Sequence, residues 1–294
     1  MLENGLVITH LGKGVAVESE QGETILCQTR RRLDTLAVGD RVRWEANGDN
    51  QGRIEEVLPR RSLLSRPARN GRQRPVAANL DRILIVIAAE PVWDCLLIDQ
   101  YLVVCEHLSI DAELVLNKID LTATTDVLEQ QLCVYQSLGY KVHRISAKTG
   151  TGMDAFQHSL QNHVCMLVGQ SGVGKSSLSN GLLPDKDIRV GELSDASGRG
   201  KHTTTAAILY HLPQGGDLID SPGVAVFGLA DIDAQALAYG YREFQTFIHQ
   251  CRFNNCRHMD DQGCAVRQAI ADKQIHPDRY QRFLKLHEKL PKIS

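Results

Sequence analysis

The sequence predicts a multidomain protein in which an all-β barrel is followed by an α/β domain and then by a small helical domain. Short apolar segments separated by glycine-containing turns fill the first part of the chain. Apolar runs alternate with helical stretches from Leu80 onward, and strand-like segments stop after Asp231. We place the domains at residues 1–72, 73–230 and 231–294 of a 294-residue chain, which is long enough for more than one core.

The first domain contains strand-like segments whose spacing suits a small closed barrel. An OB-fold is the natural candidate, although another small β domain would show the same periodicity. The predicted strands are Leu6–Ile8, Gly14–Val17, Thr24–Cys27, Arg41–Trp44 and Gly52–Val57. The stretch from Arg60 to Pro75 has six arginines and no acidic residue, which predicts an exposed basic linker.

The second domain has the pattern of buried strands alternating with helices. The predicted strands are Ile83–Ala89, Glu113–Leu116, Val142–Ile145, Cys165–Val168 and Leu218–Ile219, and the predicted helices are Leu96–Leu108, Val127–Leu138 and Lys175–Leu183. This alternation indicates a parallel sheet with helices on both faces. The tail from Ala265 to Leu290 is predicted to be helical, and its basic side chains suit either a solvated or an RNA-facing helix.

Charge is distributed unevenly along the chain. The net charge is −2, but residues 1–75 carry +3, residues 76–245 carry −9 and residues 246–294 carry +4. A polycation that binds nucleic acid by bulk charge is excluded, and the basic flanks remain candidate RNA-binding parts. No apolar run approaches the roughly 18 residues of a membrane helix, and the first residues have no secretory signal pattern. We therefore expect a cytoplasmic protein with no membrane partner.

Because disulfides are rare in a reducing compartment, the eight cysteines are expected to have other roles. Five lie among apolar neighbours and are expected to pack as small hydrophobic residues: Cys27, Cys95, Cys105, Cys133 and Cys165. The other three form the pattern Cys251-x4-Cys256-x-His258-x5-Cys264, which is a complete tetrahedral set for one structural Zn²⁺. Chance clustering is the alternative. The same loop contains Arg252 and Arg257, which suit an RNA-facing module.

A phosphate-binding motif lies between a predicted strand and a predicted helix. The segment Gly169-Gln170-Ser171-Gly172-Val173-Gly174-Lys175-Ser176 matches G-x-x-x-x-G-K-[ST], and Ser177 follows it. Its backbone N–H groups can surround phosphate oxygens at the start of the helix. Lys175 can then bridge the β- and γ-phosphates, and Ser176 can ligate Mg²⁺. A glycine-rich turn with a chance lysine is the alternative interpretation.

Two further loops predict recognition of a guanine base. Asn117-Lys118-Ile119-Asp120 follows a strand, and the Asp120 carboxylate can accept two N–H bonds from guanine, while the Asn117 amide adds bonds and the Lys118 stem covers the ring. Ser146-Ala147-Lys148 follows the next strand and can present a backbone N–H to the guanine oxygen. Each loop alone is also ordinary turn chemistry.

A fourth loop, Asp220-Ser221-Pro222-Gly223, fits the pattern D-x-x-G. In that pattern the aspartate holds Mg²⁺ through water, and the Gly223 N–H senses the γ-phosphate; a Pro-Gly turn is the alternative. Four such loops at the ends of strands in one α/β domain predict GTP binding. Asn117 and Ser146 precede Gly169, whereas in ordinary GTPases the phosphate loop comes first, so the domain is predicted to be circularly permuted.

The glycine-rich loop at residues 198–205 is a candidate for sensing the nucleotide state. Thr204 is expected to complete the Mg²⁺ shell, although threonines also favour the start of a strand. Val224 stands where a glutamine often positions the attacking water, so unassisted turnover should be slow. His202 is the local candidate for holding that water, although a loop histidine also suits solvent or RNA.

Together, these motifs, their permuted order and the Cys₃His spacing resemble the RsgA/YjeQ family of bacterial small ribosomal subunit biogenesis GTPases, over essentially the whole chain. The resemblance implies a late assembly factor that binds the small subunit and its rRNA, hydrolyses GTP with stimulation by the subunit, and then leaves. It assigns Lys175, Ser176, Thr204 and Asp220 to phosphate and Mg²⁺, Asn117 and Asp120 to the base, and His202 to hydrolysis. Gly172 stands where potassium-dependent GTPases carry an asparagine, which leaves potassium dependence open.

We therefore predict a monomeric GTP hydrolase that uses GTP, Mg²⁺ and one structural Zn²⁺. One alternative is a P-loop ATPase or kinase. Recognition of guanine by Asp120 distinguishes the GTP hydrolase from that alternative. The other is an RNA-binding assembly scaffold in which GTP only sets the conformation. Turnover measured with and without small subunits separates the scaffold from the enzyme.

Overall fold

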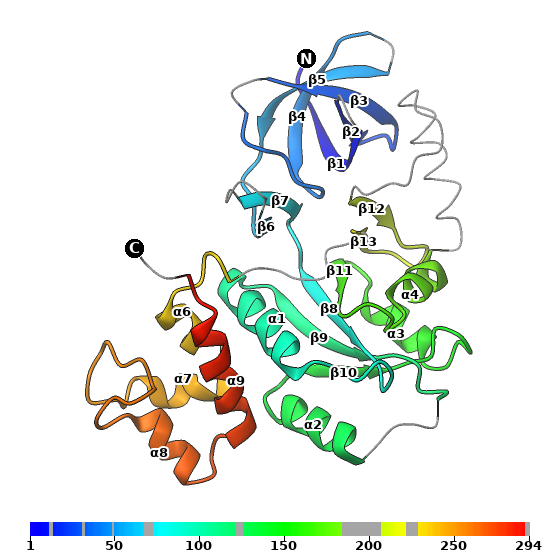
Figure 1. Cartoon of the computed structure of the whole chain (residues 1–294). Helices are drawn as coiled ribbons and strands as arrows, with labels where there is room; N and C mark the ends of the chain where they lie inside the picture. The colour runs from blue at the N-terminus through cyan, green and yellow to red at the C-terminus, as the bar shows by residue number, and fades with distance from the viewer. Residues whose placement is uncertain are drawn as a thin grey trace. The chain divides into compact units, whose positions relative to one another are not determined.

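The computed structural model describes residues 1–11, 14–30, 33–48, 50–67, 73–121, 126–183, 207–221 and 229–291 (Figure 1). The chain forms two compact units, each made of segments that are distant in the sequence. The barrel unit comprises Met1–Ile83, Gly150–Leu167 and Lys175–Val224. The helical unit comprises Leu84–Thr149, Val168–Gly174 and Ala225–Ser294. The domain boundaries expected after residues 72 and 230 stay predictions.

The N-terminal strands close into the predicted five-stranded barrel. They are β1 (Glu3–Leu11), β2 (Gly14–Ser19), β3 (Thr24–Thr29), β4 (Arg41–Ala46) and β5 (Gln51–Val57). Their order is β1-β2-β3-β5-β4, and β4 pairs back with β1, so the barrel is closed. The β3–β5 pair is parallel and the other four are antiparallel. This confirms the OB-like barrel.

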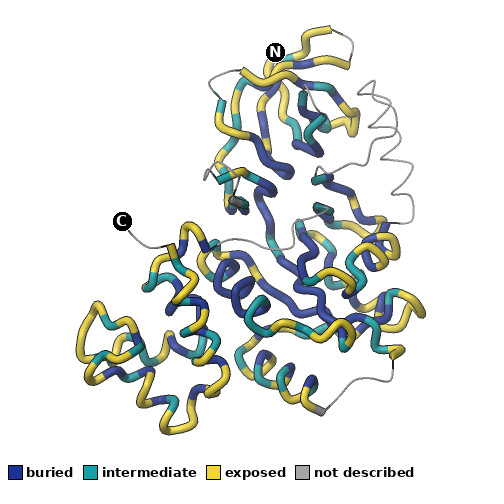
Figure 2. Tube along the Cα trace, viewed as in Figure 1, coloured by how far each residue is buried: buried dark blue, intermediate teal, exposed yellow. Residues whose placement is uncertain are grey.

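The barrel strands bury alternate residues, as a sheet with one face toward a core should. β4 and β5 alternate exposed and buried positions, and Val42, Trp44 and Ile54 all point inward. Figure 2 shows the contrast with β8 and β9, where buried residues follow one another without alternation. The two burial patterns distinguish a barrel that faces water from a sheet that is covered on both sides.

The segment that follows the barrel is a hairpin, so the prediction of an exposed basic linker was wrong. β6 (Leu63–Pro67) pairs antiparallel with β7 (Gln73–Ala78). The Arg60 guanidinium is 17% exposed and makes a bidentate pair with the fully buried Asp40, with Nε–Oδ1 2.7 Å and Nη2–Oδ2 2.8 Å. Arg61 pairs with Asp81 at 2.6 Å. Both carboxylates lie outside the arginine-rich stretch, so a local charge count could not reveal them.

The rest of the barrel unit belongs to the α/β part of the chain. It contains α3 (Met153–Ser159), β11 (Val164–Val168), α4 (Lys175–Leu182), β12 (Ile208–His211) and β13 (Asp217–Asp220). β11 and β13 are parallel, and β12 lies antiparallel between β13 and β1 of the barrel. Neither α3 nor β12 was predicted from the sequence. β12 joins the barrel strands to those that carry Asp220.

The helical unit holds the other half of the α/β part and the C-terminal helices. Its elements are α1 (Cys95–Leu108), β9 (Asp111–Leu116), α2 (Asp126–Ser137), β10 (Lys141–Arg144), α6 (Ala234–Tyr239), α7 (Arg242–Ile248), α8 (Ala265–Ala271) and α9 (Pro277–Glu288). β8 (Arg82–Ile87) enters it from the barrel unit, and the strand order is β10-β9-β8. The predicted continuous tail is two helices, because Lys273 has a positive φ and Pro277 begins a new helix.

A buried ion network fixes the C-terminal helices to α1. Asp99 is fully buried and accepts hydrogen bonds from Arg279 Nη1 at 2.5 Å, Arg282 Nε at 2.6 Å and the Tyr135 hydroxyl at 2.7 Å. Arg279 also pairs with Glu243. Removing one partner from such a network leaves a buried charge uncompensated, which is strongly destabilising. Two of the tail's basic residues therefore hold the fold together, and only the others remain candidates for contact with RNA.

The isolated cysteines follow the prediction in part. Cys27, Cys105 and Cys165 are buried, and Cys95 is half-buried. Cys133 is exposed on α2, so the expectation that it packs as a hydrophobic residue was wrong. None of the helices in the described part of the chain is both long enough and apolar enough to span a membrane.

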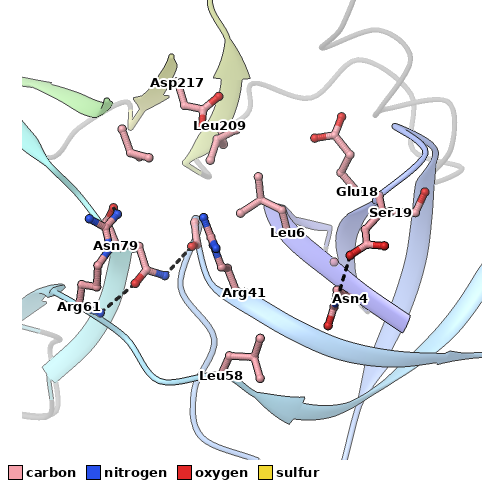
Figure 3. A pocket seen from close by; sticks show the side chains of 14 residues that line it. Asn4, Leu6, Glu18, Ser19, Arg41, Leu58, Arg61, Asn79, Leu209 and Asp217 are labelled. Carbon is pink, nitrogen blue, oxygen red and sulfur yellow. Dashed lines mark hydrogen bonds between the residues drawn. The ribbon is translucent and has the colours of Figure 1, made fainter. Parts of the chain in front are cut away.

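A charged histidine joins the barrel to β13. His211 Nδ1 contacts Asp217 Oδ1 at 2.6 Å, and its Nε2 contacts Glu18 Oε2 at 2.5 Å. Both carboxylates line a cavity of about 420 Å³ within the barrel unit (Figure 3). The hydrogen bonds to Asp217 and Glu18 raise the pKa of His211 to about 9. The imidazolium is therefore the form that links β2, β12 and β13 at neutral pH.

We expect the stability of the barrel unit to fall between about pH 6.5 and pH 9. A pKa that is raised in the folded state contributes stability fully below the ordinary value of 6.5, and that contribution is lost as the pH rises through about 9. The side chain is 43% exposed, so solvent screening limits the effect to no more than about 1 kcal/mol. Thermal unfolding of the wild type and His211→Gln should show a flatter pH profile for the variant. The exposed His158→Gln is the control, and parallel profiles for all three proteins would contradict the assignment.

Candidate functional site

The phosphate-binding motif forms the turn between β11 and α4, and its glycines are required by close approaches. Gly169 has a φ of +137°, and a Cβ there would lie 2.2 Å from the Val86 carbonyl oxygen. Gly174 has a φ of +95°, and a Cβ there would lie 2.4 Å from Asn117 Nδ2. Side chains are disfavoured in this conformation and would collide with the backbone and with Asn117. The turn therefore packs directly onto β8 and onto the first of the predicted guanine loops.

Asn117 holds three segments of the helical unit together. Its backbone N–H donates to the Ile87 carbonyl at 2.8 Å, and its Nδ2 donates to the Val173 carbonyl at 3.0 Å. Its Oδ1 accepts from the Ala147 N–H at 3.0 Å. The side chain is 2% exposed, so both of its polar ends are used inside the protein. Asn117 thus sets the position of the phosphate turn and of the Ser146–Lys148 loop. The backbone N–H of Ala147 in that loop donates to Asn117 in this structure.

Lys118 lies beside the same turn. Its Nζ donates to the Gly172 carbonyl at 2.7 Å and to the Glu90 carbonyl at 3.0 Å. Its backbone has a φ of +63°, which turns the chain away from β9 after Asn117. Because the ammonium is held by two carbonyl groups, the aliphatic stem is fixed in one direction. This supports the predicted role of the stem as a flat apolar surface for a ring.

Asp120 presents an exposed carboxylate that its neighbours keep charged. The Ser146 hydroxyl donates to Asp120 Oδ1 at 2.6 Å. That hydrogen bond is the main reason that the pKa of Asp120 lies below its usual range, and the charges of Lys148 and Lys118 act in the same direction. Ser146 is fully buried, so it fixes one carboxylate oxygen. The sequence-predicted base-recognition residues are thus brought together in one unit, with Asp120 ionised and reachable.

The remaining phosphate-side residues lie in the barrel unit. Lys175 begins α4 and is half-buried, while Ser176 and Ser177 are exposed. Burial lowers the pKa of Lys175, and the charge of Asp220 opposes that shift. The buried Ser179 hydroxyl donates to Asp220 Oδ2 at 3.4 Å. Ser179 was not predicted, because no motif marks a serine one turn into the helix. It orients the carboxylate that the sequence assigned to Mg²⁺.

Three predicted site residues lie outside the described residues. They are His202, Thr204 and Gly223. Val224, which occupies the position of the missing glutamine, lies outside them too. Their assigned roles stay predictions.

Helix α1 touches the phosphate turn at two points that the sequence did not reveal. The Gln170 side-chain oxygen accepts from the Asp94 N–H at 3.1 Å, where Asp94 is the N-cap of α1. A hydrogen bond also joins the buried Tyr101 phenol to the Gly169 backbone. That bond favours the phenolate, so the Gly169 N–H is its donor, although burial is the larger effect and raises the pKa of Tyr101. The side-chain oxygen of Gln170 and the backbone N–H of Gly169 are therefore both hydrogen-bonded to α1 or its N-cap in this structure.

The predicted metal ligands converge in the helical unit. The ligand atoms of Cys251, Cys256, His258 and Cys264 all lie within 4.8 Å of one another. His258 Nδ1 lies 3.6 Å from Cys251 Sγ and 3.5 Å from Cys264 Sγ. Burial, together with the neighbouring thiols, raises the pKa of Cys256 to about 12. A dication would reverse that effect by stabilising the thiolates. Three thiols and one imidazole in this arrangement can bind a metal ion.

Comparisons with known proteins agree with these sites. The family model described as RsgA GTPase matches residues 57–230. The chain is 46% identical over 294 residues to the small ribosomal subunit biogenesis GTPase RsgA of Haemophilus influenzae strain PittEE, a match that covers 98% of this chain and 85% of that relative. The chain belongs to the RsgA GTPase family. A Pseudomonas aeruginosa RsgA of the same description is 45% identical, over 99% of this chain and 87% of that protein.

Solved structures place the RsgA fold on the whole chain. The crystal structure of YjeQ from Thermotoga maritima matches with a TM-score of 0.79 and 32% identity, over 98% of both chains. YloQ, described as a circularly permuted GTPase, matches with a TM-score of 0.76 and 26% identity, over 98% of this chain and 94% of that one. The permuted order of the guanine loops and the phosphate turn is thus confirmed. As a member of the RsgA family, the chain is a GTP hydrolase and uses Mg²⁺ with its nucleotide.

Proposed function

We propose that this GTPase acts in the late maturation of the small ribosomal subunit, binding the subunit and its rRNA and hydrolysing GTP faster when it is bound. The observation that carries the proposal is the similarity over 98–99% of the chain to relatives named for small ribosomal subunit biogenesis. The barrel and the Cys₃His loop supply basic residues in addition to the GTPase core. We further place the protein in the cytoplasm as a monomer.

Within this proposal, the residues of the helical unit select the base. The Asp120 carboxylate accepts from guanine N1–H and its amino group, the Lys118 stem covers the ring, and Asn117 holds the surrounding loops in register. Ser146, Ala147 and Lys148 complete the pocket wall. Adenine has no equivalent pair of donors, so the pocket favours GTP over ATP.

The residues that would bind the phosphates lie where the chain passes from Gly174 into α4. The backbone N–H groups of residues 170–174 and the Lys175 ammonium stabilise the β- and γ-phosphates during in-line attack by water. Ser176, Thr204 and Asp220 would hold Mg²⁺, which neutralises phosphate charge when bound. His202 would orient the attacking water. The Cys₃His cluster would hold Zn²⁺ as a closed structural site, since all four ligands come from the protein.

The decisive experiment measures GTP turnover by the full chain with and without purified small subunits. We expect slow turnover alone and at least tenfold faster turnover with small subunits, whereas large subunits should have no effect. Lys175→Ala is expected to remove both activities, because a phosphate-bridging charge is lost. A scaffold that uses GTP only as a conformational signal would bind subunits in the GTP form without faster hydrolysis. That result would refute the proposal.

A further inference from the structure

Two arginines face each other across the β6–β7 hairpin of the barrel unit. Arg66 and Arg74 are register partners in this antiparallel pair, so their side chains leave the hairpin on the same face. Arg66 is half-buried and Arg74 is exposed. Like charges directly opposite each other are destabilising in a sheet. Among the residues that the structure describes, no carboxylate pairs with either guanidinium, in contrast to Arg60 and Arg61 nearby.

The two arginines line a cavity whose wall extends to Ser221, next to Asp220. Its volume is about 200 Å³, and its wall includes Thr35, Ala207 and Ser221 as well as Arg66 and Arg74. Ser221 directly follows Asp220, and Ala207 lies two residues after the loop at residues 198–205. The volume is roughly that of six waters in the liquid, which is enough for a phosphate group. The cavity thus lies within the barrel unit, beside Asp220 and the start of β12.

Among the described residues, no carboxylate lines this cavity to compensate its positive charge. Asp40, a nearby carboxylate, is already held in two hydrogen bonds by Arg60. His10 also lines the cavity, and its pKa is lowered mainly by burial and further by the charge of Arg74, so it stays neutral at pH 7. An anion would relieve the repulsion between the guanidiniums, and two planar donor groups on one face match the oxygens of a phosphate.

The hairpin and the far wall are both fixed in place. The Ala78 N–H donates to the Val38 carbonyl at 2.8 Å, and Asn79 Nδ2 donates to the Gly39 carbonyl at 2.9 Å. On the other side, the Thr9 hydroxyl of β1 donates to the Ala207 carbonyl at 2.8 Å. The backbone on both sides of the cavity is thus held before a ligand binds, which lowers the entropy cost of binding. A phosphate bound here would therefore lie in the same cavity as Ala207 and Ser221.

From this geometry we infer that Arg66 and Arg74 form a phosphate-binding site that is coupled to the γ-phosphate sensor. The phosphate comes either from the backbone of subunit RNA, in which case the inference rests on the proposed function, or from the nucleotide itself. An RNA phosphate would act on Ala207 and Ser221 only when the subunit is bound, which would explain stimulation of GTP hydrolysis. The two sources predict different kinetic losses.

The test uses the full chain with Arg66→Gln, Arg74→Gln and the double variant. If RNA supplies the phosphate, turnover with small subunits falls roughly tenfold or more for each arginine, and basal turnover and KM for GTP stay unchanged. The salt dependence of subunit binding should also weaken, by about one counterion for each arginine. If the nucleotide supplies it, the KM for GTP rises roughly tenfold or more without any subunit.

Two further variants make the result specific. Arg53→Gln is the matched control, because Arg53 is an exposed barrel arginine whose charge Glu55 already neutralises; it should leave both readouts unchanged. Arg66→Lys/Arg74→Lys keeps the charge but loses the planar donors and should show an intermediate loss. If variants that keep the wild-type unfolding temperature also keep subunit stimulation and the KM for GTP, the inference is overturned. If subunits fail to stimulate the wild type, the proposed function fails, and the KM measurement alone decides this site.

Discussion

Replacing Asp120 with asparagine is expected to reverse the base preference of this GTPase, from guanine to xanthine. The ionised carboxylate offers two acceptors to the N1–H and amino donors of guanine, whereas asparagine offers one acceptor and one donor. Asparagine still accepts from N1–H, so one hydrogen bond to a charged group, worth about 1.5–3 kcal/mol, is lost and two donors face each other. This predicts at least a roughly 10- to 10²-fold loss of GTP affinity. Xanthine carries a carbonyl where guanine has its amino group, so it matches the asparagine side chain.

Equilibrium binding of GTP, XTP and ATP to both proteins measures this change. The substitution keeps an oxygen that can accept from Ser146, so the loop at Ser146 should remain in place. Asp111→Asn is the matched control, since Asp111 is an exposed aspartate at the start of β9, the strand that precedes Asp120 in the sequence. Unchanged GTP selectivity in Asp120→Asn would remove Asp120 from the base site. A wild type that prefers ATP would favour the ATPase or kinase alternative.

The barrel and the α/β strands could be predicted because their patterns are local. Alternating burial in β4 and β5 and continuous burial in β8 and β9 follow directly from the period of the side chains and from whether one or both faces are covered. The turns between barrel strands contain glycines, which mark the ends of the strands in the sequence. Element type was therefore available from a few neighbouring residues, without knowledge of tertiary contacts.

The errors arose where a residue's partner is far away in the sequence. Arg60 and Arg279 both looked like solvated charges, yet Arg60 pairs with Asp40 and Arg279 with Asp99, which is 180 positions away. Leu64 is buried and anchors the hairpin that replaced the expected linker. Composition within a window counts charges but cannot show their partners. Arg66 and Arg74 differ from Arg60 and Arg61 in having no carboxylate partner among the described residues, and only the tertiary contacts show this difference.

The functional site divides in the same way. Motif spacing predicted Asn117, Asp120, Ser146 and the glycines of the phosphate turn, and the structure brings the base-side residues together. The support from Tyr101 and Ser179 could not be predicted, because a tyrosine in an amphipathic helix and a serine in the next turn are ordinary core residues. A motif records the groups that meet the ligand, and the residues that hold those groups depend on the fold.

Removing the metal from the Cys₃His cluster is expected to unfold the loop from Cys251 to Cys264. This segment contains no helix or strand, and the side chains of Arg252, Phe253, Asn254 and Asn255 are exposed. Little apolar burial is therefore available to order it without a metal. In isolated zinc-finger peptides the metal contributes about 10–16 kcal/mol, and a loop that depends on it loses its structure when the ligands are released.

The effect should extend beyond the loop, because His258 is also a packing residue. The Tyr280 hydroxyl of α9 donates to the His258 carbonyl at 2.8 Å, and the His258 ring packs against Phe244 of α7. Phe244 in turn contacts Phe283 with ring centroids 5.0 Å apart. Loss of the metal should therefore loosen α7 and α9 and then the Arg279–Asp99 pair, because Arg279 lies on the same helix as Tyr280. Hydrogen exchange should rise first in the loop and next in these two helices.

Metal analysis and hydrogen exchange on Cys256→Ser test this sequence of events. We expect one zinc ion per wild-type chain, at most a small fraction of that in the variant, and exchange in α7 and α9 that is faster by at least tenfold. Cys133→Ser is the matched control, because Cys133 is an exposed thiol of the same unit that lies outside the cluster. If a strong chelator strips the wild type of zinc without changing exchange in the loop, the ion is not structural. If the wild type holds no zinc when it is purified without chelator, the Cys₃His assignment itself fails, because four converging ligands from one folded loop should retain the ion.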